Sequence, residues 1–439
     1  MLTYLEALKY IYDLNKYGIK LGLKNIKYLL FLLGNPHQKL HIIHVGGTNG
    51  KGSTSSLISS MLKSAGFKVG LYTSPHLVDF TERMKIDYRS INQKKVAILL
   101  EKIKPFIEKV AHTPYYTHPT FFEVITAMAF IYFFEEKVDF LVLEVGLGGR
   151  LDATNVCDPL ISVITHLDYD HMDKLGNSLE EIAREKGGII KSGGILITSN
   201  QWEEADQEIN KIAQQRNSII YKVGREINYE IIKSDLKGVI FNLHGIYNNY
   251  IDLHTPLLGR HQAENAATAI ATVEALKIKG ICISKKAIRD GLKKVKWPGR
   301  LEIIQKKPMI VLDGAHNPNG IEIVKQALEE IFYYHRLILV LGIFADKDYK
   351  KMIKIIAPLA DLIITTKAKN PRATHPKIIA EEAAQYIDRN KIMVTKSIPQ
   401  AINYAISNSH QDDLICITGS LYTVGEVKRY FKIKSQDNI

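Results

Sequence analysis

The chain has 439 residues, which is too long for one ordinary hydrophobic core and favours two domains. Its 46% hydrophobic and 24% charged content are typical of a soluble globular protein, and the longest wholly apolar run, 127–134, is far too short to span a bilayer. The net charge of +12 comes from scattered lysines, and the three cysteines form neither a zinc pattern nor a disulfide framework. We therefore expect a cytoplasmic protein without a signal peptide, and we exclude nucleic-acid and membrane partners.

In chain order, apolar strand-like runs alternate with helical patterns, which predicts an α/β domain with a mostly parallel sheet. A run at 239–243 followed by 248–253 alternates more strongly and predicts a small antiparallel addition. The parallel strands are expected at 42–45, 69–72, 140–145, 160–164 and 195–198, and the helices at 57–64, 122–134, 179–190 and 262–276.

A second α/β set follows the Pro-Gly punctuation at 297–300 (WPGR). We therefore expect one domain over 1–295, a linker at 296–300 and a second domain over 301–439, with ligands bound in a cleft between the domains. The strands of the second domain are expected at 309–313, 337–342, 362–366, 392–394 and 414–418.

The most informative stretch, 44–54 (HVGGTNGKGST), lies between the first expected strand and the first expected helix. A strand, a glycine-rich turn and a helix form a phosphate-binding arrangement, because the helix N-terminus offers free N–H groups and the positive end of its dipole. Lys51 adds a charge, and the Ser53 hydroxyl can bind Mg²⁺. The stretch departs from the strict Walker A pattern at Val45 and Gly52, so the alternative is a glycine-rich turn with an incidental lysine.

Two further clusters place polar groups directly after expected strands. In 143–155 (LEVGLGGRLDATN) a strand ends in Glu144 and continues into a glycine-rich loop. Such residues line the ligand crevice of an open α/β sheet, so Glu144 is placed to hold the same Mg²⁺ as Ser53. In 168–171 (DYDH), His171 can ligate a divalent metal through its neutral ring. The alternatives are that Glu144 caps a nearby helix and that His171 is an ordinary surface histidine.

Three more candidates have weaker patterns. Lys186 lies in 182–191 (IAREKGGIIK), where the pattern alone predicts a helix that ends at Gly187-Gly188 with a lysine favoured by the dipole. In 311–320 (VLDGAHNPNG) a strand ends in Asp313 and His316 follows in a turn, which is also common turn chemistry. Arg300 in the linker could bring its guanidinium onto a phosphate.

Taken in order, these segments resemble the folylpolyglutamate synthase/dihydrofolate synthase family, within the Mur ligase superfamily. The matching stretches run from 18–37 (GIKLGLKNIKYLLFLLGNPH) to 418–422 (TGSLY) and so cover nearly the whole chain. The folate branch is marked by 71–77 (LYTSPHL) with 80–83 (FTER), by 120–123 (TFFE) and by 149–155 (GRLDATN).

The resemblance implies a monomeric, ATP-dependent amide ligase with a P-loop ATPase domain and a smaller Rossmann-like domain. ATP would phosphorylate a carboxylate of dihydropteroate or a folate, and the amine of L-glutamate would attack the acyl phosphate, releasing ADP and phosphate. The residues implied to bind ATP are Gly47, Thr48, Asn49, Gly50, Lys51, Gly52, Ser53 and Thr54, joined from the second side by Asn265, Arg300, Asp313 and His316.

The resemblance also implies two Mg²⁺ sites, with Lys51, Glu144, His171 and Lys186 as the catalytic set. Ser53 and Glu144 would hold the first ion with His171 beside it. Lys186 matches a lysine that is often carbamylated in this superfamily and would then bind the second ion. The resemblance also allows a monovalent cation such as K⁺ to bind near 346–348 (DKD). Residues 73–83 are implied to form a mobile loop near the folate. The implied substrate contacts are Ser74, Pro75, His76, Arg83, Phe122 and Asp152.

Two questions stay open at this level. Family members commonly have a small residue and Leu where this chain has Asp168-Tyr169, so Asp168 either alters metal affinity or faces solvent. The sequence does not separate a dihydrofolate synthase from a polyglutamate synthase, and we expect both activities in one enzyme. The alternatives are a cell-wall Mur ligase, for whose UDP-sugar-binding domain the residues before 46 leave no room, and a P-loop regulator without chemistry, against which Asp313 and His316 argue.

Overall fold

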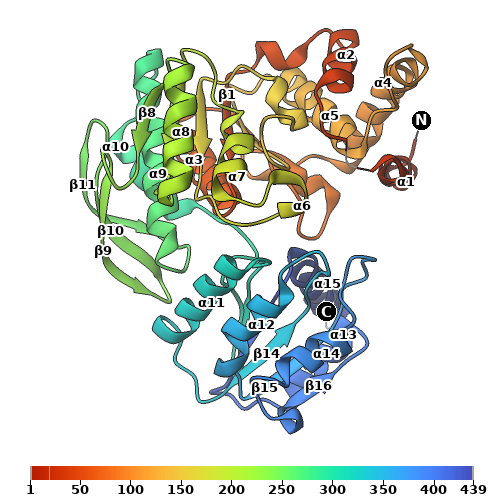
Figure 1. Cartoon of the computed structure of the whole chain (residues 1–439), viewed down its shortest axis with the longest axis vertical. Helices are drawn as coiled ribbons and strands as arrows, with labels where there is room; N and C mark the ends of the chain where they lie inside the picture. The colour runs from red at the N-terminus through yellow and green to blue at the C-terminus, as the bar shows by residue number, and fades with distance from the viewer. Residues whose placement is uncertain (1, 19, 438–439) are drawn as a thin grey trace. The chain divides into compact units, whose positions relative to one another are not determined.

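The computed structural model describes residues 2–18 and 20–437, with the side chains described as far as residue 433. The chain divides into two compact units, each an α/β structure with a mainly parallel sheet, as predicted (Figure 1). The first unit comprises residues up to 230 with 241–255 and 263–295, and the second comprises 231–240, 256–262 and the residues from 296 onward. The domain boundaries expected from the sequence stay a prediction.

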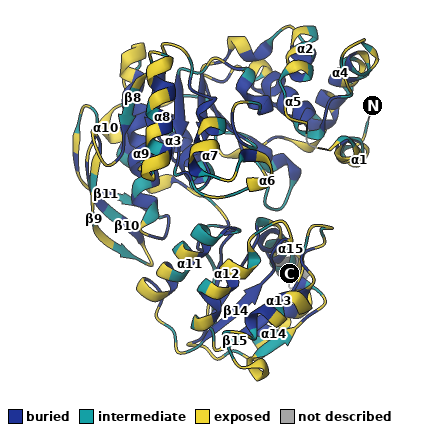
Figure 2. Cartoon of the chain, in the orientation of Figure 1, coloured by how far each residue is buried: buried dark blue, intermediate teal, exposed yellow. Residues whose placement is uncertain are grey.

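The first unit is built on a sheet with the strand order β4-β3-β2-β5-β1-β6-β7-β8. The pairs from β2 to β8 are parallel, whereas β3 and β4 form an antiparallel edge. The central strands are buried on both faces (Figure 2), which explains their continuous apolar runs. The strand bounds are β1 Ile42–Gly46, β2 Val69–Tyr72, β3 Met84–Ile86, β4 Arg89–Ser90, β5 Phe140–Glu144, β6 Ile161–Ile164, β7 Ile195–Thr198 and β8 Ile219–Lys222.

The helices of the first unit pack around this sheet, and α5 is the most deeply buried of its N-terminal group. It is apolar on every side because α1, α2 and α4 all pack against it. Its N-terminus is fixed by a capping box between Thr120 and Glu123. The helix bounds are α1 Tyr4–Asp13, α2 Lys24–Leu32, α3 Lys51–Ser64, α4 Gln93–His112, α5 Phe121–Glu135, α6 Met172–Leu175, α7 Leu179–Gly187, α8 Glu203–Gln215, α9 His261–Ala275 and α10 Lys285–Lys294.

A separate small sheet has the order β11-β10-β9. Its strands are β9 Asn228–Asp235, β10 Gly238–His244 and β11 Asn249–Thr255. Short turns join consecutive strands, which is possible only for antiparallel neighbours. The predicted antiparallel addition is therefore present, and it contains three strands instead of the two expected.

The second unit has the strand order β12-β13-β17-β14-β15-β16, in which only the β12/β13 pair is antiparallel. Its core lies between the sheet and α11, α12 and α13. The strands are β12 Glu302–Lys306, β13 Met309–Leu312, β14 Leu337–Leu341, β15 Leu362–Thr365, β16 Ile392–Val394 and β17 Leu414–Thr418. The helices are α11 Pro318–Glu330, α12 Tyr349–Ile356, α13 Pro376–Ala383, α14 Ile398–Ser407 and α15 Leu421–Asp437.

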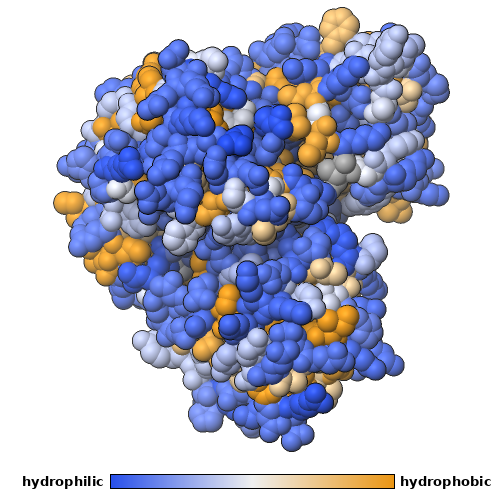
Figure 3. All heavy atoms as spheres, in the orientation of Figure 1, coloured by the Kyte–Doolittle hydropathy of each residue, from blue (hydrophilic) through white to orange (hydrophobic). Residues whose placement is uncertain are grey.

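Surface properties agree with this architecture. The face shown in Figure 3 is mostly hydrophilic, with apolar side chains in small separate patches. Within the described residues, every helix is too short or too polar to cross a membrane.

Candidate active site

The phosphate loop joins β1 to α3 and requires its glycines. Gly47 and Gly50 have φ values of 136° and 88°, a region that other residues rarely adopt. A Cβ on Gly47 would lie 1.9 Å from Thr165 Oγ1, and one on Gly50 would lie 2.3 Å from Asn265 Oδ1. The first helical hydrogen bond runs from Thr54 N to the Gly50 carbonyl, so the amides of residues 51–53 have no acceptor within the helix and can face an anion.

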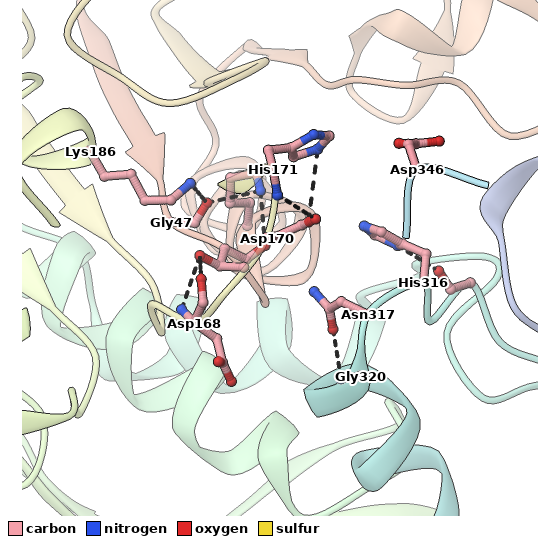
Figure 4. Close-up of polar contacts among 12 residues, drawn as sticks. Gly47, Asp168, Asp170, His171, Lys186, His316, Asn317, Gly320 and Asp346 are labelled. Carbon is pink, nitrogen blue, oxygen red and sulfur yellow. Dashed lines mark hydrogen bonds and ion pairs between the residues drawn. The ribbon is translucent and has the colours of Figure 1, made fainter. Parts of the chain in front are cut away.

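Two lysine ammonium groups converge on this loop. Lys51 Nζ donates to the carbonyl oxygens of Gly47 and Thr48, both at 3.0 Å. Lys186, buried in the last turn of α7, donates to the same Gly47 carbonyl at 2.8 Å (Figure 4). The structure therefore brings together two cations that lie far apart in the sequence. Lys186 lies at the end of a helix, as the pattern predicted, but its ammonium group also contacts the phosphate loop.

Glu144 lies beside the loop because β5 pairs with β1 in parallel and places Glu144 opposite Val45. Its buried carboxylate accepts the Ser74 N–H at 3.0 Å, which ties the 73–83 loop to the end of β5. Ser53, also buried, is the third residue of α3.

These groups fit a magnesium ion that binds together with a nucleotide. Within the described residues, no three His, Cys, Asp or Glu side chains form a metal cluster. Mg²⁺ is usually held by one or two carboxylates plus substrate phosphates and water rather than by a complete protein cage. The Glu144 carboxylate and the Ser53 hydroxyl supply such a partial set.

The 168–171 turn is bound to the phosphate loop through its backbone. Thr48 Oγ1 lies 3.1 Å from Asp168 N and 3.0 Å from Asp168 O, and can accept from the first and donate to the second. The Asp168 carboxylate accepts the Tyr169 N–H at 2.7 Å, so this departure from the family pattern serves the local turn. His171 has a φ of 51°, and its ring lies 3.8 Å from Asp170 Oδ2 (Figure 4).

The glycine-rich loop after β5 is held by Asp152. This buried carboxylate accepts the Leu147 N–H at 2.8 Å and the Thr154 hydroxyl at 2.5 Å, and burial raises its pKa. Phe122 packs against the same loop, since a Cβ on Gly146 would lie 2.3 Å from its ring. Phe122, in α5, thus packs against the loop that contains Asp152, and the Asp152 carboxylate is engaged by the protein itself.

The loop that follows β2 carries Ser74, Pro75, His76 and Arg83. Arg83 is buried and its Nε donates to His76 Nδ1 at 2.9 Å. Its guanidinium carbon lies 5.5 Å from the Phe121 ring centroid and 6.0 Å from that of Phe80. A cation between aromatic faces can recognise an anionic aromatic ligand.

One buried polar residue of this region received no role from the sequence. His44 in β1 lies 2.8 Å from Thr154 Oγ1 through Nε2 and 3.8 Å from Cys157 Sγ through Nδ1. Burial, reinforced by the Lys191 charge, lowers the pKa of His44 to about 3, so the ring is neutral. The available signal was a lone histidine within an apolar strand.

In the second unit, Asp313 organises the turn after β13. Its two carboxylate oxygens accept the Leu301 N–H at 2.8 Å and the Ala315 N–H at 2.7 Å. Burial raises the pKa of Asp313, and the neighbouring Arg300 charge opposes this shift. His316 Nδ1 lies 3.0 Å from the Gly314 carbonyl in this turn (Figure 4 shows His316). The Arg300 guanidinium lies beside the same glycine, because a Cβ on Gly314 would be 2.7 Å from Arg300 Nη1.

Comparisons with known proteins agree along the whole chain. The Mur ligase middle domain matches residues 45–273, and the Mur ligase, glutamate ligase domain matches 299–421. A dihydrofolate synthase/folylpolyglutamate synthase of Bacillus subtilis is 38% identical over 435 residues, which is 98% of this chain and 99% of the relative. A folylpolyglutamate synthase of Lacticaseibacillus casei is 34% identical over 430 residues, 98% of each chain.

The fold of the chain is also similar to that of a solved structure. The Mycobacterium tuberculosis folylpolyglutamate synthase complexed with ADP and AMPPCP superposes with a TM-score of 0.91 at 30% identity. The match covers 98% of this chain and 99% of that one.

Proposed function

This chain belongs to the Mur ligase family, in its dihydrofolate synthase/folylpolyglutamate synthase branch, and from that premise we propose that it joins L-glutamate to both dihydropteroate and reduced folates at the expense of ATP. The observation that carries the proposal is the convergence of the Lys51 and Lys186 ammonium groups on the phosphate loop beside Glu144. A second reading, polyglutamate synthase activity alone, is favoured by the L. casei relative.

The first chemical step is phosphoryl transfer. An oxygen of the substrate carboxylate attacks the γ-phosphorus, the bond between that phosphorus and the ADP oxygen breaks, and an acyl phosphate forms. Charge spreads over the γ-phosphoryl oxygens during this step, so positioning and neutralisation dominate catalysis. Lys51 would exchange its two carbonyl acceptors for phosphate oxygens, and the amides of 51–53 would bind the same group.

The second step forms the amide. The uncharged amine of L-glutamate attacks the acyl carbon, loses a proton, and the carbon–oxygen bond to phosphate breaks. Mg²⁺ held by Ser53, Glu144 and the nucleotide would neutralise the phosphate charge that develops in the first step. By the resemblance, His171 would lie beside the metal, and Arg300, Asp313 and His316 would contact the nucleotide. Asn265 lies against Gly50 of the phosphate loop.

The proposal extends to several finer points that the resemblance implied. Lys186 would be carbamylated in the active enzyme and hold a second Mg²⁺. A monovalent cation near 346–348 rests on the resemblance alone, since Asp346 is ion-paired with Arg372 at 2.5 Å. We also propose a cytoplasmic monomer. An intact mass without the CO₂ adduct in bicarbonate, together with an unchanged rate, would remove the carbamylation from the proposal.

The main test measures phosphate release by the purified protein with ATP, Mg²⁺ and L-glutamate, using 7,8-dihydropteroate or tetrahydrofolate as the acceptor, with each product confirmed by mass. Release with both acceptors supports the bifunctional enzyme. Release with tetrahydrofolate alone supports the second reading. Release with neither, in folded protein that binds ATP, contradicts the folate assignment.

A further inference from the structure

A row of three lysines lies on the surface of the first unit, and the ammonium group of each lies over a tyrosine ring. Lys16 Nζ and Lys20 Nζ lie 5.0 and 5.9 Å from the Tyr17 ring centroid. Lys24 Nζ lies 5.1 Å from the Tyr116 centroid and 5.9 Å from that of Tyr115. All three lysines are exposed, and no carboxylate pairs with them in the part of the chain that the structure describes. The buried Glu123 carboxylate interacts with Lys20, whose charge opposes the burial that raises the pKa of Glu123, and the exposed row as a whole presents positive charge.

The tyrosines beneath the lysines are held firmly in place. Tyr17 stacks on His118 with 4.0 Å between the ring centroids, and Tyr116 stacks on Tyr28 at 4.3 Å. The rings come from three segments, the 3₁₀ turn Leu14–Tyr17, α2 and the 115–118 loop before α5. Helices α2 and α5 lie side by side (Figure 1), so the lysines stand on a rigid aromatic base.

The 115–118 loop also carries a ring that is almost fully exposed, with the Lys24 ammonium group near it. Tyr115 is 90% exposed and has a φ of 71°. A large side chain that extends from the surface in the left-handed region offers an exposed ring to a flat aromatic ligand.

The row continues toward the predicted folate contacts. Phe121, three residues beyond His118, stacks on Tyr12 with 5.9 Å between centroids and carries the Arg83 guanidinium on its ring. Tyr12 is itself 40% exposed and lies two residues before the turn that carries Tyr17. Cations and aromatic rings thus follow one another from Arg83 to Lys24.

Repeated addition of glutamate would require a binding surface for the part of the substrate that moves away from the phosphate loop. Each new glutamate must present its carboxylate at the phosphate loop, so each round moves the rest of the substrate away from that loop. The displaced part gains one carboxylate per added glutamate and still ends in the aromatic pteroyl group. A long substrate therefore needs cations and an aromatic face beyond the site that serves a short one.

We propose that Lys16, Lys20 and Lys24, with Tyr115, bind the displaced part of long-chain folates, the lysines taking the carboxylates and Tyr115 the pteroyl ring. The proposal rests on the proposed function and adds a second binding surface to it. It makes the preference for substrate length a property of this surface rather than of the phosphate loop.

The test uses charge reversal at two of the lysines. The variant Lys20→Glu/Lys24→Glu is assayed by phosphate release with tetrahydrofolate carrying one glutamate or four. We expect the KM for the four-glutamate substrate to rise about tenfold, the KM for the one-glutamate substrate to change less than about twofold, and both kcat values to stay unchanged. Added salt should reduce the difference from the unmodified protein.

Two matched variants complete the design. Lys20→Arg/Lys24→Arg keeps the charge and should keep both KM values. Lys277→Glu/Lys285→Glu reverses two other lysines that lie over tyrosines, at 4.8 Å from Tyr247 and 5.7 Å from Tyr250, and should leave both KM values unchanged.

The outcomes separate this proposal from the proposed function. Normal turnover with equal KM changes for both substrates, or with the same change in the Lys277/Lys285 control, overturns the lysine row alone. An unmodified protein that adds glutamate to neither substrate overturns both. A rise confined to the long substrate and absent from the control supports the row.

Discussion

The two units place charged groups at the carboxyl ends of parallel strands but hold them differently. In the first unit, Lys51 and Lys186 reach across to carbonyl oxygens of the phosphate loop, contacts that phosphate oxygens can replace. In the second unit, both oxygens of Asp313 accept N–H groups of its own turn. The lysine ammonium groups of the first unit can therefore still bind a ligand, whereas the Asp313 carboxylate of the second unit is used to hold its own turn together. Substitution of Lys51 or Lys186 should therefore affect activity alone, whereas substitution of Asp313 should affect both activity and stability.

The largest expected effect tests the first half of that contrast. Lys51→Met should lower kcat/KM by on the order of 1,000-fold or more, because it removes a charge that stabilises the transferring phosphoryl group. Its unfolding midpoint should change little, since its hydrogen bonds to Gly47 and Thr48 carbonyls lie at a partly solvated surface. Phosphate release and urea unfolding measure the two quantities.

Lys63→Met is the matched control for this prediction, because Lys63 lies on the same helix and donates to the Asp87 carbonyl. It should keep nearly full activity. Strong destabilisation by Lys51→Met would mean that the phosphate loop depends on Lys51 for its own conformation, and the contrast between the units would fail.

The second prediction concerns Asp313. Asp313→Ala should lower activity by about 100-fold and also destabilise the second unit by about 2–3 kcal/mol, because the N–H groups of Leu301 and Ala315 lose their acceptor in a buried turn. Each unit contains one tryptophan, Trp202 in the first and Trp297 in the second. Urea unfolding followed by Trp297 fluorescence in a Trp202→Phe background therefore reports on the second unit.

An Asp313→Ala protein that loses activity but unfolds at the same urea concentration would show that the carboxylate acts on the ligand alone. Asp313→Asn provides the control, since its side-chain oxygen can still accept one of the two N–H groups. It should fall between the unmodified protein and the alanine variant in stability.

Sequence patterns predicted the parts of this molecule that are local in the chain. The phosphate loop was predicted because a strand, glycines, a lysine and a helix follow one another within 42–64, and 69–72 and 195–198 have the predicted strand bounds. The edge strands β8 and β12 were not predicted, because they are partly exposed and their apolar runs are only three and two residues long.

The contacts that assemble the site could not be predicted in the same way. Lys186 and Gly47 are 139 residues apart, and His44 and Thr154 are 110 apart. Such pairs depend on strand order, which places β6 and β5 on either side of β1. The resemblance selected Lys186 without saying which atom it meets, and it gave His44 no role.

The third prediction concerns His44, a buried polar group of the first unit that we expect to stabilise the fold rather than to bind a ligand. His44 binds no proton in the folded protein until the pH falls to about 3, whereas the unfolded chain takes one up near pH 6.5. The unfolded state thus binds more protons in this window, so stability must fall as the pH falls. His44→Gln should remove this component, at most about 1.4 kcal/mol per pH unit below pH 6.5.

Urea midpoints at pH 7 and pH 5, followed by Trp202 fluorescence in a Trp297→Phe background, measure the His44 effect within the first unit. The variant should be the less stable protein at pH 7, where it loses the Thr154 contact, and should lose less stability on acidification. Parallel pH profiles for the two proteins would show that His44 is not the group responsible.

The smallest effect should come from the ion pair between Arg150 and Glu185. It lies at the contact between the glycine-rich loop and the end of α7, with Arg150 Nη2 at 2.8 Å from Glu185 Oε1, and the arginine side chain is 52% exposed. Arg150→Ala should therefore lower the free energy of unfolding by less than about 1 kcal/mol.

Gly149→Ala is the informative comparison, because its Cβ would lie 2.8 Å from the Lys186 carbonyl and 2.9 Å from that of Glu185. It should destabilise the first unit more than Arg150→Ala and displace Lys186 with a loss of activity. Equal effects would mean that the ion pair, rather than the close backbone approach, sets the position of Lys186.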